Sequence, residues 1–216
     1  MNGKISWWHS RLYRLYDHLT LNDSIQPVDL IFVMAGRMER KPYGVELYRV
    51  GVAPRLLLSI GRFEVSKMRT VDFVNAAELI ALRDRTAPGD RHFFCEINAA
   101  GTRIETVRLR RWNTYGEVLG LREFLKRDMP RSVMVVSTGV HLRRVAATFD
   151  RVFRDAPLEA RYCPVPARIS SVRKEEWWAR PEDRKYVFSE LMKLAAYRSI
   201  LRMPEWLIGR IMRLKG

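Results

Sequence analysis

Histidine, arginine and hydroxyl side chains gather directly after one apolar run of this sequence. The stretch STGVHLRR, residues 137–144, follows the run VMVV and precedes the helical pattern VAATFDRVF. A solvated turn needs none of these side chains in particular, whereas an anion uses all of them, because arginine is a bidentate donor to phosphate and carboxylate. Histidine accepts or donates a proton near neutral pH. The candidates for an anion site with acid–base capacity are Ser137, Thr138, His141 and Arg144.

Two earlier turns carry similar residue types next to apolar runs. Small residues there let backbone N–H groups approach a ligand, and the N-terminus of a following helix carries partial positive charge. We therefore predict that these turns form further walls of the same anion-binding pocket. The candidates are Gly36, Arg37 and Arg40 after the run DLIFVM, and Ser59 and Gly61 at the end of the run RLLLSIG.

Short apolar runs alternate with longer amphipathic stretches along the chain. Near-continuous apolar runs are typical of strands buried on both faces, and their alternation with helices favours a parallel sheet. We predict an α/β fold, a three-layer Rossmann-like domain with a mainly parallel sheet of about five strands. Ligands of such folds bind outside the carboxyl ends of the strands. The predicted strands are 29–34, 55–59, 92–97, 132–137 and 158–163; the predicted helices are 39–50, 66–85, 114–127, 141–153 and 181–201; residues 164–180 are predicted as an irregular loop folding over the sheet edge.

Each candidate residue also has a purely structural explanation. Glycine after a strand is common turn chemistry, and Ser137 or Thr138 can cap the following helix. Arginine is abundant in a chain with a net charge of +15, so most arginines here are solvated. A histidine in the first turn of a helix is often structural. The functional interpretation therefore depends on these residues meeting at one edge of the sheet.

Composition and charge bound the class of protein. With 47% hydrophobic and 29% charged residues the chain is typical of folded globular proteins. The net charge of +15 and a pI of about 10.4 favour acidic partners, namely nucleic acid, an anionic membrane face or phosphorylated ligands. Cys95 and Cys163 lie in apolar runs, which predicts buried reduced thiols. No apolar stretch is long enough to span a membrane and the N-terminus is too polar for a signal peptide, so we expect a cytoplasmic location.

Four motifs, in order, resemble the SanA/ElyC/YdcF-type family of bacterial proteins. The first is DLIFVMAGRMERKPYGVELYRVGVAPRLLLSIGR, residues 29–62, and the second is RRWNTYGEVLGLREFL, residues 110–125. The third is VMVVSTGVHLRRVA, residues 133–146, with His141 and Arg144 at the positions of the family's histidine and arginine. The C-terminal motif is represented by Trp178, Glu190, Lys193 and Tyr197.

The resemblance implies a role in bacterial envelope or polysaccharide biogenesis and adds Asn113 and Thr114 to the ligand site. It also implies S-adenosylmethionine as an alternative ligand. The chain departs from the family pattern in having only Gly36 after the first strand, and Ser59-Ile60-Gly61 in place of Ser-Gly-Gly. It also has Gly116-Glu117 where the family has Glu-Asn. These departures favour a looser anion site over a close phosphate cradle.

The chemistry of the candidates suits the handling of a phosphoryl or pyrophosphoryl group. Like charge from Arg143 and Arg144 and the helix dipole disfavour the protonated form of His141, which leaves a neutral imidazole as a catalytic acid or base. Glu117, one turn into its helix, can orient an arginine or act as a base, and it is the second catalytic candidate. We predict no metal site, because the sequence has no carboxylate cluster suited to Mg²⁺. It also has no Walker sequence and no full dinucleotide glycine fingerprint.

Three classes of function fit these observations. The first is a cytoplasmic-side protein of envelope or exopolysaccharide biogenesis that binds, or acts on as a hydrolase or transferase, a phosphorylated or polyprenyl-linked ligand. The second is a binder of a small molecule such as S-adenosylmethionine or a nucleotide. A nucleic-acid binder is the third, and it is disfavoured because the arginines are scattered and no recognition motif is present. The sequence does not separate the first two.

Both chain ends carry apolar residues beside cations, the pattern of a helix at a membrane interface. We predict an N-terminal amphipathic helix within residues 1–27, an α/β domain over 28–202 and a basic amphipathic tail over 203–216. The ends are candidates for contact with the inner membrane face, and the alternative is that they pack on the sheet or on another subunit. The apolar residues are Trp7, Trp8, Leu12, Leu15, Tyr16 and Leu19 at one end and Trp206, Leu207, Ile208, Ile211, Met212 and Leu214 at the other.

Overall fold

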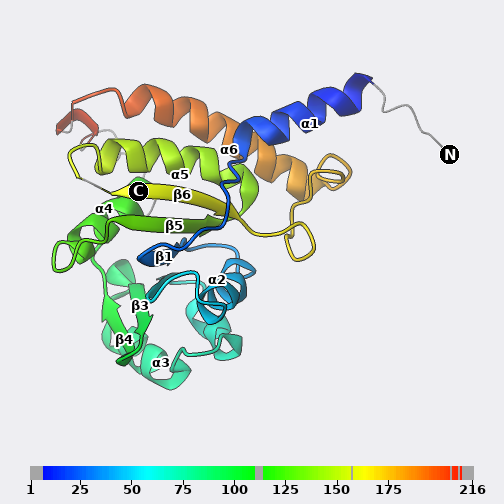
Figure 1. The fold of residues 1–216 in the computed structure, drawn as a ribbon. Coiled ribbons are helices and arrows are strands. Elements are labelled where there is room, and N and C mark those ends of the chain that lie inside the picture. The colour runs from blue at the N-terminus through cyan, green and yellow to red at the C-terminus, as the bar shows by residue number, and fades with distance from the viewer. Residues whose placement is uncertain (1–6, 110–113, 157, 205, 209, 211–216) are drawn as a thin grey trace.

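The chain forms one six-stranded mixed sheet with helices on both faces (Figure 1). The computed structural model describes residues 7–109, 114–156, 158–204, 206–208 and 210. The strand order is β4-β3-β2-β1-β5-β6. The predicted α/β, Rossmann-like fold is thereby confirmed. The strands are β1 (Leu30–Val33), β2 (Leu56–Gly61), β3 (His92–Asn98), β4 (Gly101–Thr106), β5 (Ser132–Ser137) and β6 (Glu159–Pro164).

Four neighbouring strands pair in parallel, and β3 alone runs in the opposite direction. β1 pairs in parallel with β2 and with β5, and β5 pairs in parallel with β6. β3 runs antiparallel to β2, and β4 returns antiparallel to β3. The strand β4 was absent from the sequence prediction because its residues, GTRIET, are exposed or half-buried and form no apolar run. The antiparallel direction of β3 brings its first residue, His92, beside Gly61 at the end of β2.

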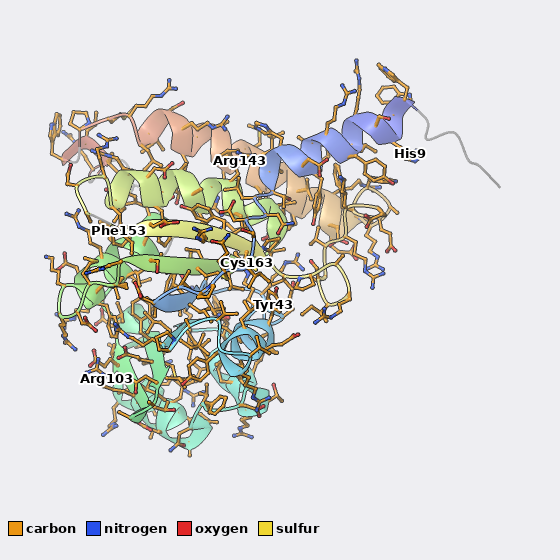
Figure 2. All side chains as sticks on the ribbon, viewed as in Figure 1. His9, Tyr43, Arg103, Arg143, Phe153 and Cys163 are labelled. Atoms are coloured by element: carbon orange, nitrogen blue, oxygen red, sulfur yellow. The ribbon has the colours of Figure 1, made fainter. Side chains whose placement is uncertain are left out.

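The two faces of the sheet bury separate hydrophobic clusters. Alternate residues of a strand point to opposite faces, so Ile31 and Val33 of β1 pack with α2 and α3, whereas Leu30 and Phe32 pack with α4 and α5. Side chains fill the space between the sheet and both helix layers (Figure 2). The helices are α1 (Trp7–Leu19), α2 (Arg40–Arg49), α3 (Ala76–Arg85), α4 (Thr114–Leu125), α5 (Gly139–Val152) and α6 (Pro181–Ile200).

The single helix predicted over residues 66–85 is wrong, because the chain breaks there. A 3₁₀ helix, η1 (Val65–Thr70), is followed by an extended turn before α3 begins at Ala76. Phe73 in that turn has a φ of 66°, which an α-helix does not accommodate. The side chain of Asn75 then caps α3 by accepting a hydrogen bond from the backbone N–H of Glu78.

The predicted N-terminal helix and the irregular segment 164–180 pack together against α5 and α6. Leu12 and Leu15 of α1 pack against a cluster that includes the fully buried Leu19 and Trp177. Tyr16 donates a hydrogen bond from its hydroxyl to the backbone oxygen of Val172, at 3.1 Å. Leu12, Leu15, Tyr16 and Leu19 of α1 therefore pack on the domain itself, whereas Trp7 and Trp8 stay exposed.

Two smaller predictions can be checked in the same structure. Cys95 and Cys163 are free and buried, as predicted, and the hydroxyl of Tyr43 lies 3.5 Å from the sulfur of Cys163 (Figure 2). None of the helices that the structure describes is long and apolar enough to cross a membrane. Most of the tail 203–216 lies outside the described residues.

Candidate functional site

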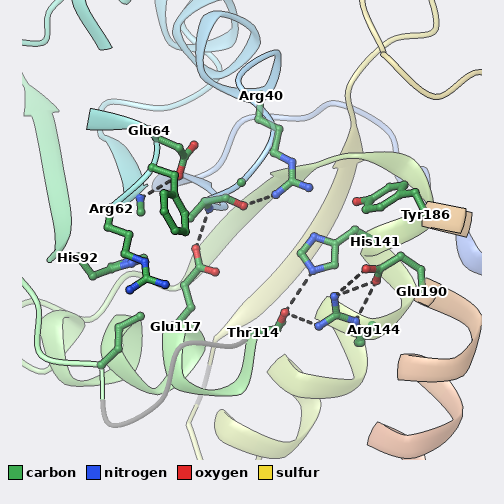
Figure 3. Close-up of a pocket in the computed structure, with 15 residues that line it drawn as sticks. Arg40, Arg62, Glu64, His92, Thr114, Glu117, His141, Arg144, Tyr186 and Glu190 are labelled. Carbon is green, nitrogen blue, oxygen red and sulfur yellow. Dashed lines mark hydrogen bonds and ion pairs between the residues drawn. The ribbon is translucent and has the colours of Figure 1, made fainter. Parts of the chain in front are cut away.

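A pocket of about 500 Å³ opens at the carboxyl ends of β1 and β2 (Figure 3). Its walls come from the turns after these two strands, from the start of β3, and from the first turns of α4 and α5. Helix α6 closes one side with Tyr186 and Glu190. The lining residues are Ala35, Gly36, Arg40, Gly61, Arg62, Phe63, Glu64, His92, Leu109, Thr114, Glu117, His141, Arg144, Tyr186 and Glu190.

Most of the residues singled out from the sequence meet at this pocket. Gly36, Arg40, Gly61, Thr114, Glu117, His141 and Arg144 line it directly. Ser59, Ser137 and Thr138 lie just behind the wall, where each hydrogen-bonds a lining side chain: His92, His141 and Arg40 respectively. Asn113 lies outside the described residues.

Arg37 turns away from the pocket. Its guanidinium hydrogen-bonds the hydroxyl of Ser171 and stacks 4.3 Å from the ring centre of Tyr186. Ser171 in turn donates to the carboxylate of Glu39, at 2.6 Å. Arg37 therefore ties the segment 164–180 to the turn after β1, and it does not belong to the lining side chains.

His141 is held by hydrogen bonds on both ring nitrogens. Nδ1 lies 2.8 Å from the hydroxyl of Ser137 and Nε2 lies 3.2 Å from the hydroxyl of Thr114. Arg144 can only donate, so Thr114 Oγ1 accepts from it and keeps a second lone pair and its own proton for Nε2 of His141. The contacts therefore fit either neutral tautomer of the imidazole.

The protonated form of His141 is strongly disfavoured. Burial lowers the pKa of His141 well below 6.5, and the charges of Arg144 and Arg40 lower it further. The sequence predicted a neutral imidazole from the like charge of its neighbours and from the helix dipole, whereas burial is the largest cause in the structure. His141 is thus a neutral imidazole beside two guanidinium groups.

Arg144 is fully compensated by a carboxylate. Its Nε and Nη2 atoms donate to the two oxygens of Glu190, at 2.9 and 3.1 Å. The side chains are 9% and 2% exposed, so this is a buried bidentate pair between α5 and α6. The guanidinium also lies 5.1 Å from the ring centre of Tyr197. Arg144 therefore braces α6 against α5 and holds Thr114 in place.

Arg40 differs from Arg144 in having no carboxylate partner among the described residues, although it is only 3% exposed. Its Nε donates to Thr138 Oγ1 at 3.1 Å, and Nη1 donates to the backbone oxygen of Ala35. Figure 3 shows the guanidinium pointing from α2 toward the side of the pocket where His141 lies. A buried guanidinium without a counter-charge is costly, and an anion in the pocket would relieve that cost.

A second hydrogen-bonded group lies on the β2 and β3 side of the pocket. Ser59 is fully buried, with its hydroxyl 2.8 Å from Nε2 of His92. Burial lowers the pKa of His92 to about 4, so this ring is also neutral. Glu117 accepts a hydrogen bond from the backbone N–H of Ala35, at 2.7 Å. Burial raises the pKa of Glu117, against the opposing effect of that bond and of a hydrogen bond from Ser59. A raised pKa strengthens Glu117 as a base, the role that the sequence suggested, and also favours its protonated, acidic form.

Lys41 and Glu64 form a buried ion pair beside this group. Nζ of Lys41 is 2.9 Å from Oε1 of Glu64 and 2.8 Å from the backbone oxygen of Met34. The other carboxylate oxygen of Glu64 accepts from the backbone N–H of Gly61, at 2.8 Å. Burial lowers the pKa of Lys41, and Glu64 opposes that change. The pair fixes the turn after β2 against α2.

Several pocket residues were not identified from the sequence. Glu64, His92 and Tyr186 lie on segments with no recognisable motif, and they reach the pocket only through the fold. His92 offered a usable signal, since it is a histidine at the start of an apolar run, but a parallel β3 would have put it at the opposite edge. No group of three or more His, Cys, Asp or Glu residues suited to a metal ion occurs in the part of the chain that the structure describes.

Comparisons with known proteins add no evidence on the function of this pocket. No protein-family model, no curated protein and no solved structure matches the chain. The resemblance to the SanA/ElyC/YdcF-type family stays a prediction.

Proposed function

We propose that this protein binds a phosphorylated ligand in the pocket at the carboxyl ends of β1 and β2. The phosphate lies against the guanidinium of Arg40, and His141 on the neighbouring wall exchanges a proton with the ligand or with a water attacking it. The observation that carries the proposal is the contrast between Arg40, buried without a carboxylate partner in the described residues, and Arg144, which is fully paired.

Arg40 keeps donor capacity for a ligand. Its hydrogen bonds to Thr138 and to the backbone oxygen of Ala35 use Nε and Nη1, and both acceptors are neutral oxygens that supply no counter-charge. Gly36 lies beside it, and a Cβ at Gly36 would stand 3.1 Å from Nη1 of Arg40. The glycine therefore keeps space open next to the guanidinium, where a planar arrangement of donors suits phosphate oxygens.

The bound anion also changes the chemistry of His141. The charge of Arg40 is one cause of the lowered pKa of His141, so an anion that neutralises Arg40 raises that pKa. Nε2 of His141 lies 3.2 Å from the hydroxyl of Thr114, so a nucleophile takes the place of that hydroxyl when it gives its proton to this nitrogen. The raised pKa makes His141 a stronger base for that step.

The test is a set of calorimetric titrations with inorganic phosphate, pyrophosphate and sulfate at constant ionic strength. We compare the wild type with Arg40→Met and with Arg103→Met, a control arginine on the opposite edge of the sheet. Loss of Arg40 is expected to weaken binding about tenfold to a hundredfold, the range for hydrogen bonds to charged groups. Arg103→Met is expected to bind as the wild type does.

Arg40→Lys separates charge from geometry. It keeps the positive charge but lacks the planar fork, so an intermediate affinity is expected. Thermal melting of each variant shows whether it folds. Equal phosphate affinity in folded Arg40→Met and wild type would contradict the proposal and leave Arg40 with a structural role.

We further propose, from the sequence resemblance, that the natural ligand belongs to bacterial envelope or exopolysaccharide biogenesis and is phosphorylated or polyprenyl-linked. The pocket supports the phosphorylated part of this proposal through Arg40 only. Mass spectrometry of small molecules released from the purified protein identifies the ligand class directly. Recovery of an uncharged ligand would contradict both parts.

A nucleotide is the second candidate, favoured by aromatic rings at the pocket. Phe63 is 76% exposed and lines the pocket, and Tyr186 lines the opposite wall. Aromatic faces stack on nucleobases, so a nucleoside diphosphate would then bind more tightly than pyrophosphate, and Phe63→Ala would remove that difference. S-adenosylmethionine, implied by the resemblance, is included in the same titrations as the cationic alternative.

A further inference from the structure

Helix α6 carries two distinct stripes of side chains. The inward stripe repeats at helical spacing and is buried: Asp183, Val187, Glu190, Leu194 and Tyr197. The outward stripe also follows helical spacing but is apolar or small and exposed: Phe188, Met192, Ala195, Ala196 and Ser199. Phe188 is 48% exposed and Met192 is 70% exposed. A helix whose packing is complete on one side normally presents polar residues on the other.

Beyond the exposed Glu182 in the first turn of α6, the exposed charges of this helix are all positive. Exposed Arg184, Lys185, Lys193 and Arg198 border the apolar stripe. Glu190 is the only acidic residue between positions 184 and 200, and it is 2% exposed and paired with Arg144 and with Lys193. Apolar side chains between cations, with no exposed acid from position 184 to 200, are the pattern of a helix that lies in a membrane interface.

The neighbouring helix α1 adds aromatic residues to the same outer layer. Helices α1 and α6 contact each other and both pack on α5, on the side away from the sheet (Figure 1). Trp7 is 57% exposed and Trp8 is 65% exposed, and the guanidinium of Arg11 lies 3.7 Å from the ring centre of Trp7. Tryptophan is enriched at membrane–water interfaces.

We propose that the outward face of α6, defined by Phe188, Met192, Lys185 and Arg198, docks on an anionic lipid bilayer. Lys185 and Arg198 identify this occupant, because neither has an ion-pair partner among the described residues and acidic headgroups complement them. A second copy of the chain would place the same cations against each other, and like charges oppose that arrangement. This surface differs from the terminal tail, and the proposal is independent of the ligand in the pocket, because vesicle binding is measured without it.

The experiment is vesicle flotation of the full chain without any added ligand. Vesicles of phosphatidylcholine alone are compared with equal parts of phosphatidylcholine and phosphatidylglycerol. The wild type is expected to float with the anionic vesicles and to stay behind with the neutral ones. Lys185→Glu with Arg198→Glu is expected to reduce partitioning about tenfold or more, since each cation near an anionic surface contributes to binding. Phe188→Ser with Met192→Ser is expected to lower it about tenfold.

Matched controls lie on the opposite helix layer. Lys67→Glu with Arg69→Glu on η1 changes the net charge by the same amount as the α6 charge variant, and both residues are exposed. Val50→Ser removes a side chain that is 71% exposed at the end of α2. Both controls are expected to float as the wild type does.

Three outcomes would overturn the proposal. The first is equal recovery of the wild type with neutral and anionic vesicles. The second is an equal loss in the α6 and η1 charge variants, which would show a general effect of net charge. The third is a dimer in sedimentation velocity that the Phe188→Ser, Met192→Ser variant abolishes, which would show that the face binds a second copy.

Discussion

Two pockets of similar size lie at opposite edges of the sheet, and both contain several arginines. The pocket at the carboxyl ends of β1 and β2 has a volume of about 500 Å³, and the one beside the β3–β4 hairpin has about 530 Å³. In the hairpin pocket every arginine is paired with a carboxylate: Arg55 with Glu96 and Asp128, Arg103 with Glu96 and Glu105, and Arg127 with Glu105. In the first pocket, Arg40 has no such partner among the described residues.

The difference shows that charge compensation is a better guide to a ligand site than volume. An arginine that is paired with a carboxylate already has a counter-charge, so binding an anion stabilises it little. A buried arginine without such a partner is stabilised when an anion binds. The first pocket also contains His92, His141 and Glu117, whose pKa values are displaced by burial. Displaced pKa values cluster at functional sites.

The largest expected effect is on the free energy of unfolding, when Glu190 and Glu96, the carboxylates that pair with arginines in the two pockets, are each replaced. Glu190→Gln leaves Arg144 buried without its charge partner, and breaking a buried pair costs about 3–5 kcal/mol. Glu96 is also buried, but Glu96→Gln leaves Arg55 with Asp128 and Arg103 with Glu105, so a smaller cost of about 1 kcal/mol is expected. Denaturant unfolding measures both free energies. Equal losses would show that the two networks are equally redundant.

The second prediction concerns the loss of stability at low pH. The folded-state pKa of His92 is about 4, below its ordinary value of 6.5, so the unfolded chain binds a proton that the folded chain does not. The contribution of His92 to the free energy of unfolding is therefore fully present above pH 6.5. It is lost as pH falls toward 4, by about 3 kcal/mol in total.

Unfolding of the wild type and His92→Gln at a series of pH values isolates this contribution. The variant is expected to lose less stability than the wild type between pH 6.5 and 4, because glutamine does not titrate. The hairpin pocket has no histidine in its lining. A His92→Gln variant with the full acid sensitivity of the wild type would place the sensitivity elsewhere.

The smallest expected effect uses two glycines with the same backbone geometry. Gly36 in the first pocket and Gly101 in the hairpin pocket both have a φ of +121°, so alanine at either position costs about 1–3 kcal/mol in strain. Only at Gly36 does the added Cβ approach Arg40, at 3.1 Å; at Gly101 nothing lies within 4 Å.

Gly36→Ala is therefore expected to weaken phosphate binding several-fold, whereas Gly101→Ala leaves it unchanged. Calorimetric titration at a temperature where both variants are folded makes the comparison. Unchanged affinity in Gly36→Ala would mean that the ligand does not use the space beside Arg40.

Much of the fold and part of the site could be predicted from local sequence. The strands at the centre of the sheet were predicted to within a few residues, because LIFV, LLLSIG and SVMVVS are apolar enough to be buried on both faces. Residues that follow such strands gather at one edge in a parallel sheet, which is why Gly36, His141 and Arg144 were found together. The hairpin strand β4 was missed because an exposed strand has no apolar signature.

Sequence by itself thus determined the α/β class, the buried thiols and the side chains that stand after β1, β2 and β5. Only the tertiary structure decided which arginine carries an uncompensated charge. Arg144 and Glu190 are 46 residues apart and meet because α6 docks on α5, whereas no carboxylate of the described chain comes within ion-pair distance of Arg40. The tertiary structure also decided that His141 and His92 are neutral, because it buries both rings. Burial depends on every element that covers a group, and no local run of residues contains that information.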